Sequence, residues 1–302
     1  MSPGAAQQVP ADWLSQTRDE LESYLAKCLG QLDQVDPVLS EAMAYSLLNG
    51  GKRLRACLVL ATGQALEVPV PALMPAAAAI EAVHAYSLVH DDMPCMDNDT
   101  MRRGKPTSHV KYGQAMALLT GDALQTLAFE WLSGNALLTD KARLSQVQVL
   151  AKAAGAQGMA NGQAIDLRNV GQPMTVEALK HMHARKTGDL ILASVRMGYL
   201  ACETLEKDRM DALEEYAKAL GLAYQVLDDI LDVEASSEEL GKTSGKDAAA
   251  NKPTMVSLLG LEQAKALLNQ LKESAEQACV RLNPVHSCHL YELIQLITQR
   301  KS

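Results

Sequence analysis

The chain has 302 residues, of which 48% are hydrophobic and 21% charged, an ordinary balance for a globular protein. Its formal net charge of −8 and the lack of any basic block argue against a general nucleic-acid binder. Aromatic residues make up only 4%, so the core must consist mainly of Ala, Leu, Val, Ile and Met, which favours helices over sheets.

The pattern is helical along nearly the whole chain. Apolar residues at 3–4 spacing predict a first helix over 11–33. Pro71 opens a helix that runs to about Met93, where Pro94 stops or kinks it. A polar loop follows over 98–107. Further helices are predicted over 110–134, 142–169, 176–200, 207–234, 254–260, 262–281 and 286–299.

The punctuation between these segments does not indicate separate domains. Thr175 is a suitable N-cap for the helix that follows it. Residues 235–252 read as a polar, glycine-bearing loop. No alternating strand run exceeds about four residues, and no repeat or composition shift is present. We therefore expect one all-α domain over 1–302, with a loose tail over about 1–10 and one or two buried central helices.

The expected location is the cytoplasm. The six cysteines (Cys28, Cys57, Cys95, Cys202, Cys279 and Cys288) are scattered without CxxC or zinc-ligand spacing, which is typical of reduced thiols. The first nine residues lack a signal-peptide pattern. No uninterrupted apolar run reaches about 18 residues, so we expect no stable membrane insertion.

Two aspartate clusters stand out because each lies in an apolar helical pattern, where unneutralised carboxylates are costly. In the second, Asp228 and Asp232 are four residues apart and share one helix face, with Asp229 beside them. Apolar residues flank this cluster on both sides, unlike a solvated acidic face. Such carboxylates make half of a site for a hard divalent cation, and Mg²⁺ usually brings phosphates with it.

The first cluster, Asp91 to Asp97, needs a turn to work as a site. In a straight helix Asp91 and Asp97 would point about 120° apart. Pro94 ends the helix, so the following turn can bring Asp97 back toward Asp91, with Asp92 partly outward. An acidic helix C-terminus without a cation would oppose the helix dipole. Asp122, in another apolar helix, either supports this site or is solvated.

Small basic sets accompany the acidic clusters and predict an anionic substrate such as a diphosphate. After the flexible pair Gly50-Gly51, Lys52 and Arg55 share one face at a helix start. His84 lies two turns before Asp91 on the same helix face. The other basic sets are Arg102-Arg103, Lys186, Lys242 and Lys252. A nucleotide P-loop and a Rossmann glycine fingerprint are both absent.

Taken in order, these motifs resemble those of the trans-prenyl diphosphate synthases, in particular the bacterial farnesyl diphosphate synthases. The resemblance covers about residues 38–300. The motifs that carry it are GGKRLR (50–55), EAVHAYSLVHDDMPCMDNDTMRRGKPTSH (81–109), GDAL (121–124), NGQAIDL (161–167), KTG (186–188), YQVLDDILD (224–232), GKTSGKD (241–247) and NKPT (251–254).

The resemblance implies a helical bundle around a deep central active-site cavity of the isoprenoid synthase type, normally a homodimer. It implies the condensation of isopentenyl diphosphate with dimethylallyl or geranyl diphosphate to farnesyl diphosphate. About three Mg²⁺ ions, with Mn²⁺ as a possible substitute, hold the allylic diphosphate. The direct metal ligands fall on Asp91, Asp97 and Asp228, and the supporting carboxylates on Asp92, Asp229 and Asp232.

The substrate-binding roles of the family also fall on residues of this chain. The allylic diphosphate would be held by Arg102, Lys186 and Lys242. The isopentenyl diphosphate would be held by Lys52, Arg55, His84 and Arg103. Thr187 and Gln225 match groups near the reacting carbons.

The residue that limits product length is predicted to lie on the helix that carries Asp91. Tyr86 lies five residues before Asp91, or about 7.5 Å along the axis, so its ring can block a longer prenyl tail. Ser87 beside it is small. In the family, an aromatic here with the inserted Pro94-Cys95 accompanies a farnesyl product, so we prefer C15 over C20.

One departure from the family pattern and three rival functions remain. Tyr224 stands where the family usually has Phe. A geranylgeranyl (C20) diphosphate synthase is the first alternative. A non-catalytic regulatory subunit is the second, but such a chain would be expected to have lost aspartates or lysines. A terpene cyclase is disfavoured because the second cluster and the basic isopentenyl site are both intact.

Overall fold

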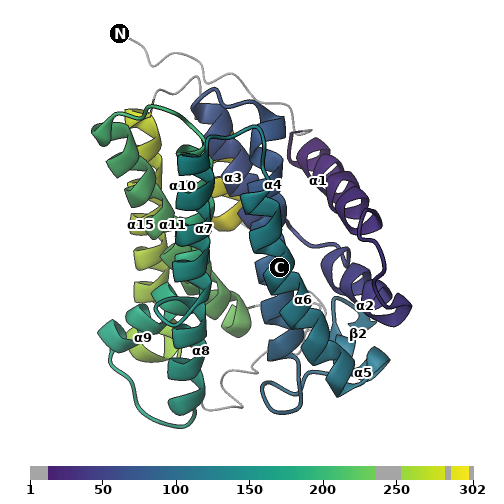
Figure 1. The fold of residues 1–302 in the computed structure, drawn as a ribbon. Coiled ribbons are helices and arrows are strands. Elements are labelled where there is room, and N and C mark those ends of the chain that lie inside the picture. The colour runs from purple at the N-terminus through teal and green to yellow at the C-terminus, as the bar shows by residue number, and fades with distance from the viewer. Residues whose placement is uncertain (1–12, 235–252, 283–286, 299–302) are drawn as a thin grey trace.

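The computed structural model describes residues 13–234, 253–282 and 287–298 (Figure 1). The helices of the first half are α1 (Trp13–Gly30), α2 (Pro37–Leu47), α3 (Leu54–Ala65), α4 (Val70–Asp91), α5 (Ser108–Tyr112), α6 (Gln114–Ser133) and α7 (Asp140–Ala154). Those of the second half are α8 (Met159–Arg168), α9 (Val176–His183), the π-helix η1 (Ala184–Gly188), α10 (Asp189–Leu200), α11 (Lys207–Glu234), α14 (Met255–Leu259), α15 (Leu261–Arg281) and α16 (Cys288–Thr298). Among the described residues the only strands form an antiparallel hairpin, β1 (Met101–Arg102) with β2 (Lys105–Pro106).

Helix α4 is the central helix of the bundle and is buried on nearly every face. Its four consecutive alanines, 76–79, are fully buried, and small side chains let neighbouring helices approach closely. In α3, a Cβ at Gly63 would lie 2.3 Å from Leu73 Cδ1, so glycine is needed at this contact. Within the described residues α4 alone is long and apolar enough to cross a membrane, but 83% of its apolar window is buried in the protein.

The remaining helices surround this centre in layers. Figure 1 shows α1 and α2 along one side of the bundle and α15 along the opposite side. The main apolar core extends from Leu21 of α1 to Ile297 of α16. A smaller core lies where α9, α11, α14 and α15 meet, around Leu179 and Met255. The predicted all-α architecture is therefore present.

Helix starts follow the local sequence signals. The Asp36 carboxylate accepts the N–H groups of Val38 and Leu39 at the start of α2. Thr175 caps α9, as predicted, by accepting the N–H of Ala178.

The predicted loop over 235–252, including Lys242 and Lys252, lies outside the described residues, as does the predicted tail over 1–10.

Three segments predicted as single helices are interrupted. Residues 110–134 lie in α5 and α6, which are separated by Gly113 at φ 85°. A turn with Gly155 and Gly158 divides 142–169 into α7 and α8. The segment 176–200 contains the π-helical turn η1. Apolar residues continue at helical spacing on both sides of each break, so periodicity alone cannot locate the break.

Candidate active site

The first aspartate cluster lies at the C-terminal end of α4, and the chain turns back there. The N–H of Asp97 donates to the carbonyl of Asp91 at 2.8 Å, and that of Asn98 to Met93 at 3.1 Å. Asn98 adopts a left-handed conformation with φ 53°, which asparagine tolerates. The predicted return of Asp97 toward Asp91 is therefore confirmed.

Asp91 is half-buried among polar partners from other helices. Its pKa is raised to about 6, mainly by burial and also by the nearby Asp97, although Lys186 and a hydrogen bond from Gln163 act to lower it. The Gln163 side-chain N–H donates directly to Asp91 Oδ1. A carboxyl group held this way gains from a cation, because neutralisation relieves both the burial and the repulsion.

Asp92 does not point outward, so this part of the prediction was wrong. The residue is only 3% exposed. Its carboxylate accepts bonds from Arg102 Nε at 2.9 Å and Nη2 at 2.6 Å. The β1–β2 hairpin folds back over the end of α4 and places Arg102 there, which buries Asp92 in a two-pronged ion pair.

The second cluster lies near the end of α11. Asp228 and Asp232 lie four residues apart in this unbroken helix and are half-buried. Asp229 is buried, and its Oδ2 accepts the N–H of Met255 at 2.6 Å, at the start of α14. Among the described residues, no three acidic, histidine or cysteine side chains converge closely enough to hold a metal ion by themselves. An ion here would need further ligands.

A cavity of about 490 Å³ joins residues that the sequence only suggested would meet. The four predicted isopentenyl-diphosphate residues, Lys52, Arg55, His84 and Arg103, all line it. Asp228 of the second cluster lines the same cavity. Thus the loop before α3, the middle of α4, the β hairpin and α11 meet at one place.

The cavity is strongly cationic. Burial lowers the pKa of His84 well below its usual range, and the Arg55 and Arg103 guanidinium groups lower it further, so His84 is neutral. Within the described chain, Arg55 Nε is buried and has no hydrogen-bond partner. A buried charged donor without an acceptor is costly. An anionic ligand would satisfy it.

Lys186 faces the first cluster from η1. Its Nζ lies 2.5 Å from Asp166 Oδ2, and although burial alone would lower its pKa, Asp166 and then Asp91 raise it. Thr187 beside it is buried. Short π-helical turns of this kind are frequent at functional sites.

Sequence reasoning assigned no role to Gln163 and Asp166, which contact Asp91 and Lys186. Both belong to the NGQAIDL motif, and their i, i+3 spacing on α8 places them on one face. This spacing is the sequence feature from which their position on one helix face could have been predicted. Gln225 is half-buried on α11, three residues before Asp228.

Tyr86 lies on α4 against α6. It is 8% exposed, and its ring meets that of His90 edge-on at 5.8 Å. Gln125 of α6 forms a side-chain hydrogen bond with Tyr86. Ser87 Oγ donates to the His84 carbonyl at 2.8 Å.

The side chain of Asp122 is 62% exposed, which favours the solvated alternative for that residue.

Comparison with known proteins agrees with this geometry. The sequence pattern of the polyprenyl synthetase family matches residues 36–286. The chain is 47% identical to the farnesyl diphosphate synthase of Escherichia coli over 251 residues, 82% of this chain and 84% of that protein.

Solved structures agree as well. A geranyltransferase from Legionella pneumophila superposes with a TM-score of 0.87 and 33% identity, over 95% of this chain and 96% of that one. A geranyltransferase from Helicobacter pylori, complexed with magnesium and isoprenyl diphosphate, gives 0.84 and 35%, over 98% of each chain.

These comparisons define an all-helical isoprenoid synthase fold. The chain belongs to the polyprenyl synthetase family. The resemblance to bacterial farnesyl diphosphate synthases that the motifs indicated is confirmed.

Proposed function

We propose that this protein is a Mg²⁺-dependent farnesyl diphosphate synthase. It condenses isopentenyl diphosphate with dimethylallyl or geranyl diphosphate and releases diphosphate. The observation that carries the proposal is the cavity that holds Lys52, Arg55, His84 and Arg103 together with Asp228. The cavity supplies cationic side chains for one diphosphate, next to a carboxylate of the kind that binds Mg²⁺.

The isopentenyl diphosphate would bind in this cavity. Lys52, Arg55 and Arg103 offer positive charge to its phosphates, and the unsatisfied Arg55 Nε fits such an acceptor. Neutral His84 can donate one hydrogen bond without adding charge. These residues would fix the alkene in position for attack.

Magnesium would be held by Asp91, Asp97 and Asp228, with the oxygens of the allylic diphosphate as further ligands. When bound, the ions supply charge stabilisation to the departing diphosphate. Asp92 and Asp229 support the site differently, since one holds Arg102 and the other the start of α14. The family resemblance suggests about three ions, with Asp232 in support.

The reaction itself makes few demands on the protein for acid–base groups. As the allylic C–O bond breaks, Arg102, Lys186 and Lys242 would stabilise the leaving diphosphate. The alkene of isopentenyl diphosphate forms the new C–C bond, and the released diphosphate accepts the proton that is lost. Thr187 and Gln225 would line the position of the cationic carbons.

We further propose that the product is C15 and that Tyr86, with Ser87 beside it, ends the space for the prenyl tail. The buried position of Tyr86 below Asp91 on α4 supports this. A C20 product is the alternative. A purely regulatory role has no support, because every charged residue of the family's site motifs is present.

A homodimer is proposed as the working form. Exposed leucines on consecutive helices support it: Leu118 and Leu119 on α6 are 46% and 52% exposed, and Leu144 on α7 is 59% exposed. Leu118 and Leu119 are adjacent in α6, and exposed apolar side chains are candidates for a protein–protein contact. A cytoplasmic location remains part of the proposal.

The metal site is tested by Asp91→Ala and Asp228→Ala. Each should lower turnover by about 10³-fold, because a charge that holds the leaving group is lost. Chelation with EDTA should abolish activity, and MgCl₂ should restore it. Asp211→Ala, at an exposed position on the same helix as Asp228, is the matched control and should remain active. Full activity in either site variant, with unchanged folding by circular dichroism, would remove that residue from the metal site.

A further inference from the structure

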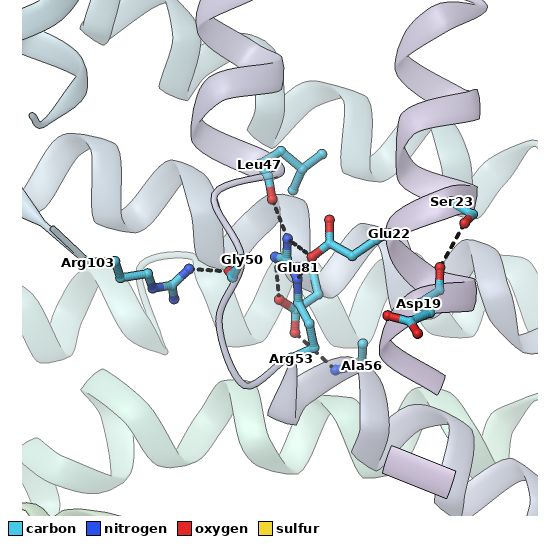
Figure 2. Close-up of polar contacts among 9 residues, drawn as sticks. All are labelled: Asp19, Glu22, Ser23, Leu47, Gly50, Arg53, Ala56, Glu81 and Arg103. Atoms are coloured by element: carbon cyan, nitrogen blue, oxygen red, sulfur yellow. Dashed lines mark hydrogen bonds and ion pairs between the residues drawn. The ribbon is translucent and has the colours of Figure 1, made fainter. Parts of the chain in front are cut away.

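Arg53 lines the basic cavity, yet its side chain is directed to protein groups (Figure 2). Its Nε and Nη2 lie 2.7 and 2.6 Å from Glu22 Oε1. Nη1 lies 3.2 Å from Glu81 Oε2, and Nη2 also donates to the Leu47 carbonyl at 2.6 Å. The residue is only 6% exposed. Its donor directions are therefore largely taken before any ligand arrives.

Glu81 joins two elements through its two oxygens. While Oε2 pairs with Arg53, Oε1 accepts the N–H of Ala56 at 3.1 Å. That N–H belongs to the first turn of α3, which otherwise lacks a side-chain cap. Glu81 is 2% exposed and lies on α4, three residues before His84. One carboxylate thus fixes the start of α3, next to Arg55, relative to the helix that carries His84.

The loop before α3 is held in an unusual backbone shape. Arg53 itself has φ 48°, in the left-handed region, which non-glycine residues adopt only when the surroundings enforce it. On the other side of the loop, an Arg103 guanidinium N–H donates to the Gly50 carbonyl. A Cβ on Gly51 would lie 2.7 Å from that guanidinium. Lys52 lies between these two anchor points.

We propose that Glu22, Arg53 and Glu81 are positioning residues for the isopentenyl diphosphate site. They hold Lys52 and Arg55 in a geometry that fits the diphosphate, and Arg53 is not itself a ligand. Buried ion pairs of this kind serve geometry better than stability, because desolvation offsets much of their attraction. Through Glu22 this ion-pair network includes α1, which otherwise contributes none of the proposed site residues. This inference rests on the proposed function of the cavity.

The direction of the effect separates positioning from simple electrostatics. Glu22→Gln removes a negative charge beside a cationic cavity, so charge alone predicts tighter binding of an anion and a lower KM for isopentenyl diphosphate. Loss of positioning predicts the opposite. Because the Glu22 side chain is 33% exposed, we expect this variant to fold. Glu81→Gln is the second, more buried variant.

The experiment measures steady-state KM for isopentenyl diphosphate and for geranyl diphosphate in both variants, with melting temperatures. We expect the isopentenyl KM to rise about threefold to tenfold, as for a weakened charge-assisted contact, and the geranyl KM to stay within about twofold. Glu20→Gln, exposed on the same helix, is the matched control and should change neither KM. Lys52→Ala tests the cavity itself and should raise the isopentenyl KM.

Each result then has one meaning. An unchanged or lower isopentenyl KM in both glutamine variants, while Lys52→Ala raises it, overturns the positioning role and leaves the proposed function intact. An equal rise in both KM values indicates general loosening and also overturns it. No effect of Lys52→Ala overturns the proposed cavity function and this inference with it.

Discussion

Asp92 and Asp229 each stand beside a proposed metal ligand, but their carboxylates contact protein groups. Asp92 holds Arg102 of the β hairpin, and Asp229 holds the N–H of Met255. The sequence predicted which aspartates cluster, because that depends on local spacing. It could not predict these two partners, since each arrives from a segment whose docking is decided by tertiary packing.

Tyr86 is the residue whose proposed role is the easiest to test. Tyr86→Ala should shift the main product from C15 toward C20, because removing the ring opens space below Asp91 on α4. Products made with geranyl diphosphate as starter would be sized by chromatography. Gln125→Ala should give a smaller shift, because the ring remains but loses its hydrogen bond from α6. An unchanged C15 product in Tyr86→Ala would refute the proposal that Tyr86 ends the space for the prenyl tail.

At the scale of elements, helix type and order follow from sequence, whereas helix breaks do not. The pattern over 176–200 is helical throughout, yet η1 inserts a π-turn that carries Lys186 and Thr187. A reason for this geometry lies in α8, a separate segment. A Cβ on Gly162 would lie 2.2 Å from the Lys186 backbone nitrogen, so the two backbones are in direct contact. Such an approach is invisible to periodicity.

Gly162→Ala should therefore displace η1. Alanine is intrinsically better than glycine in a helix by about 1 kcal/mol, but the clash with backbone atoms outweighs this gain. We expect a loss of about 1–3 kcal/mol in the free energy of unfolding and of about tenfold in kcat, because Lys186 moves. Urea denaturation and steady-state kinetics would measure both. Gly30→Ala, where no atom lies within 4 Å of the new Cβ, is the matched control. Wild-type kcat in Gly162→Ala would contradict the importance of this contact.

For the whole molecule, composition alone indicated an aromatic-poor, helical core, and the main core around α4 agrees with it. We propose that the chain forms a single domain, because this core joins helices from both ends. The sequence could not show which apolar residues stay exposed, since the pattern of an interface helix resembles that of a core helix. The leucines of α6 and α7 became evident only in the structure.

The proposed dimer predicts a change in mass on substitution of these leucines. Leu119→Glu combined with Leu144→Glu should halve the mass measured by light scattering, because two charges would be buried without partners. Val280→Glu on α15, at a position 59% exposed, is the matched control and should leave the mass unchanged. A wild-type mass equal to one chain would rule out the dimer.

The central claim is the condensation itself, and one assay tests it most directly. Purified protein would be incubated with Mg²⁺, isopentenyl diphosphate and geranyl diphosphate, and the products sized by chain length. The proposed function predicts farnesyl diphosphate as the main product, formed together with an equal amount of released diphosphate. The absence of any C15 or C20 product from folded protein would contradict it.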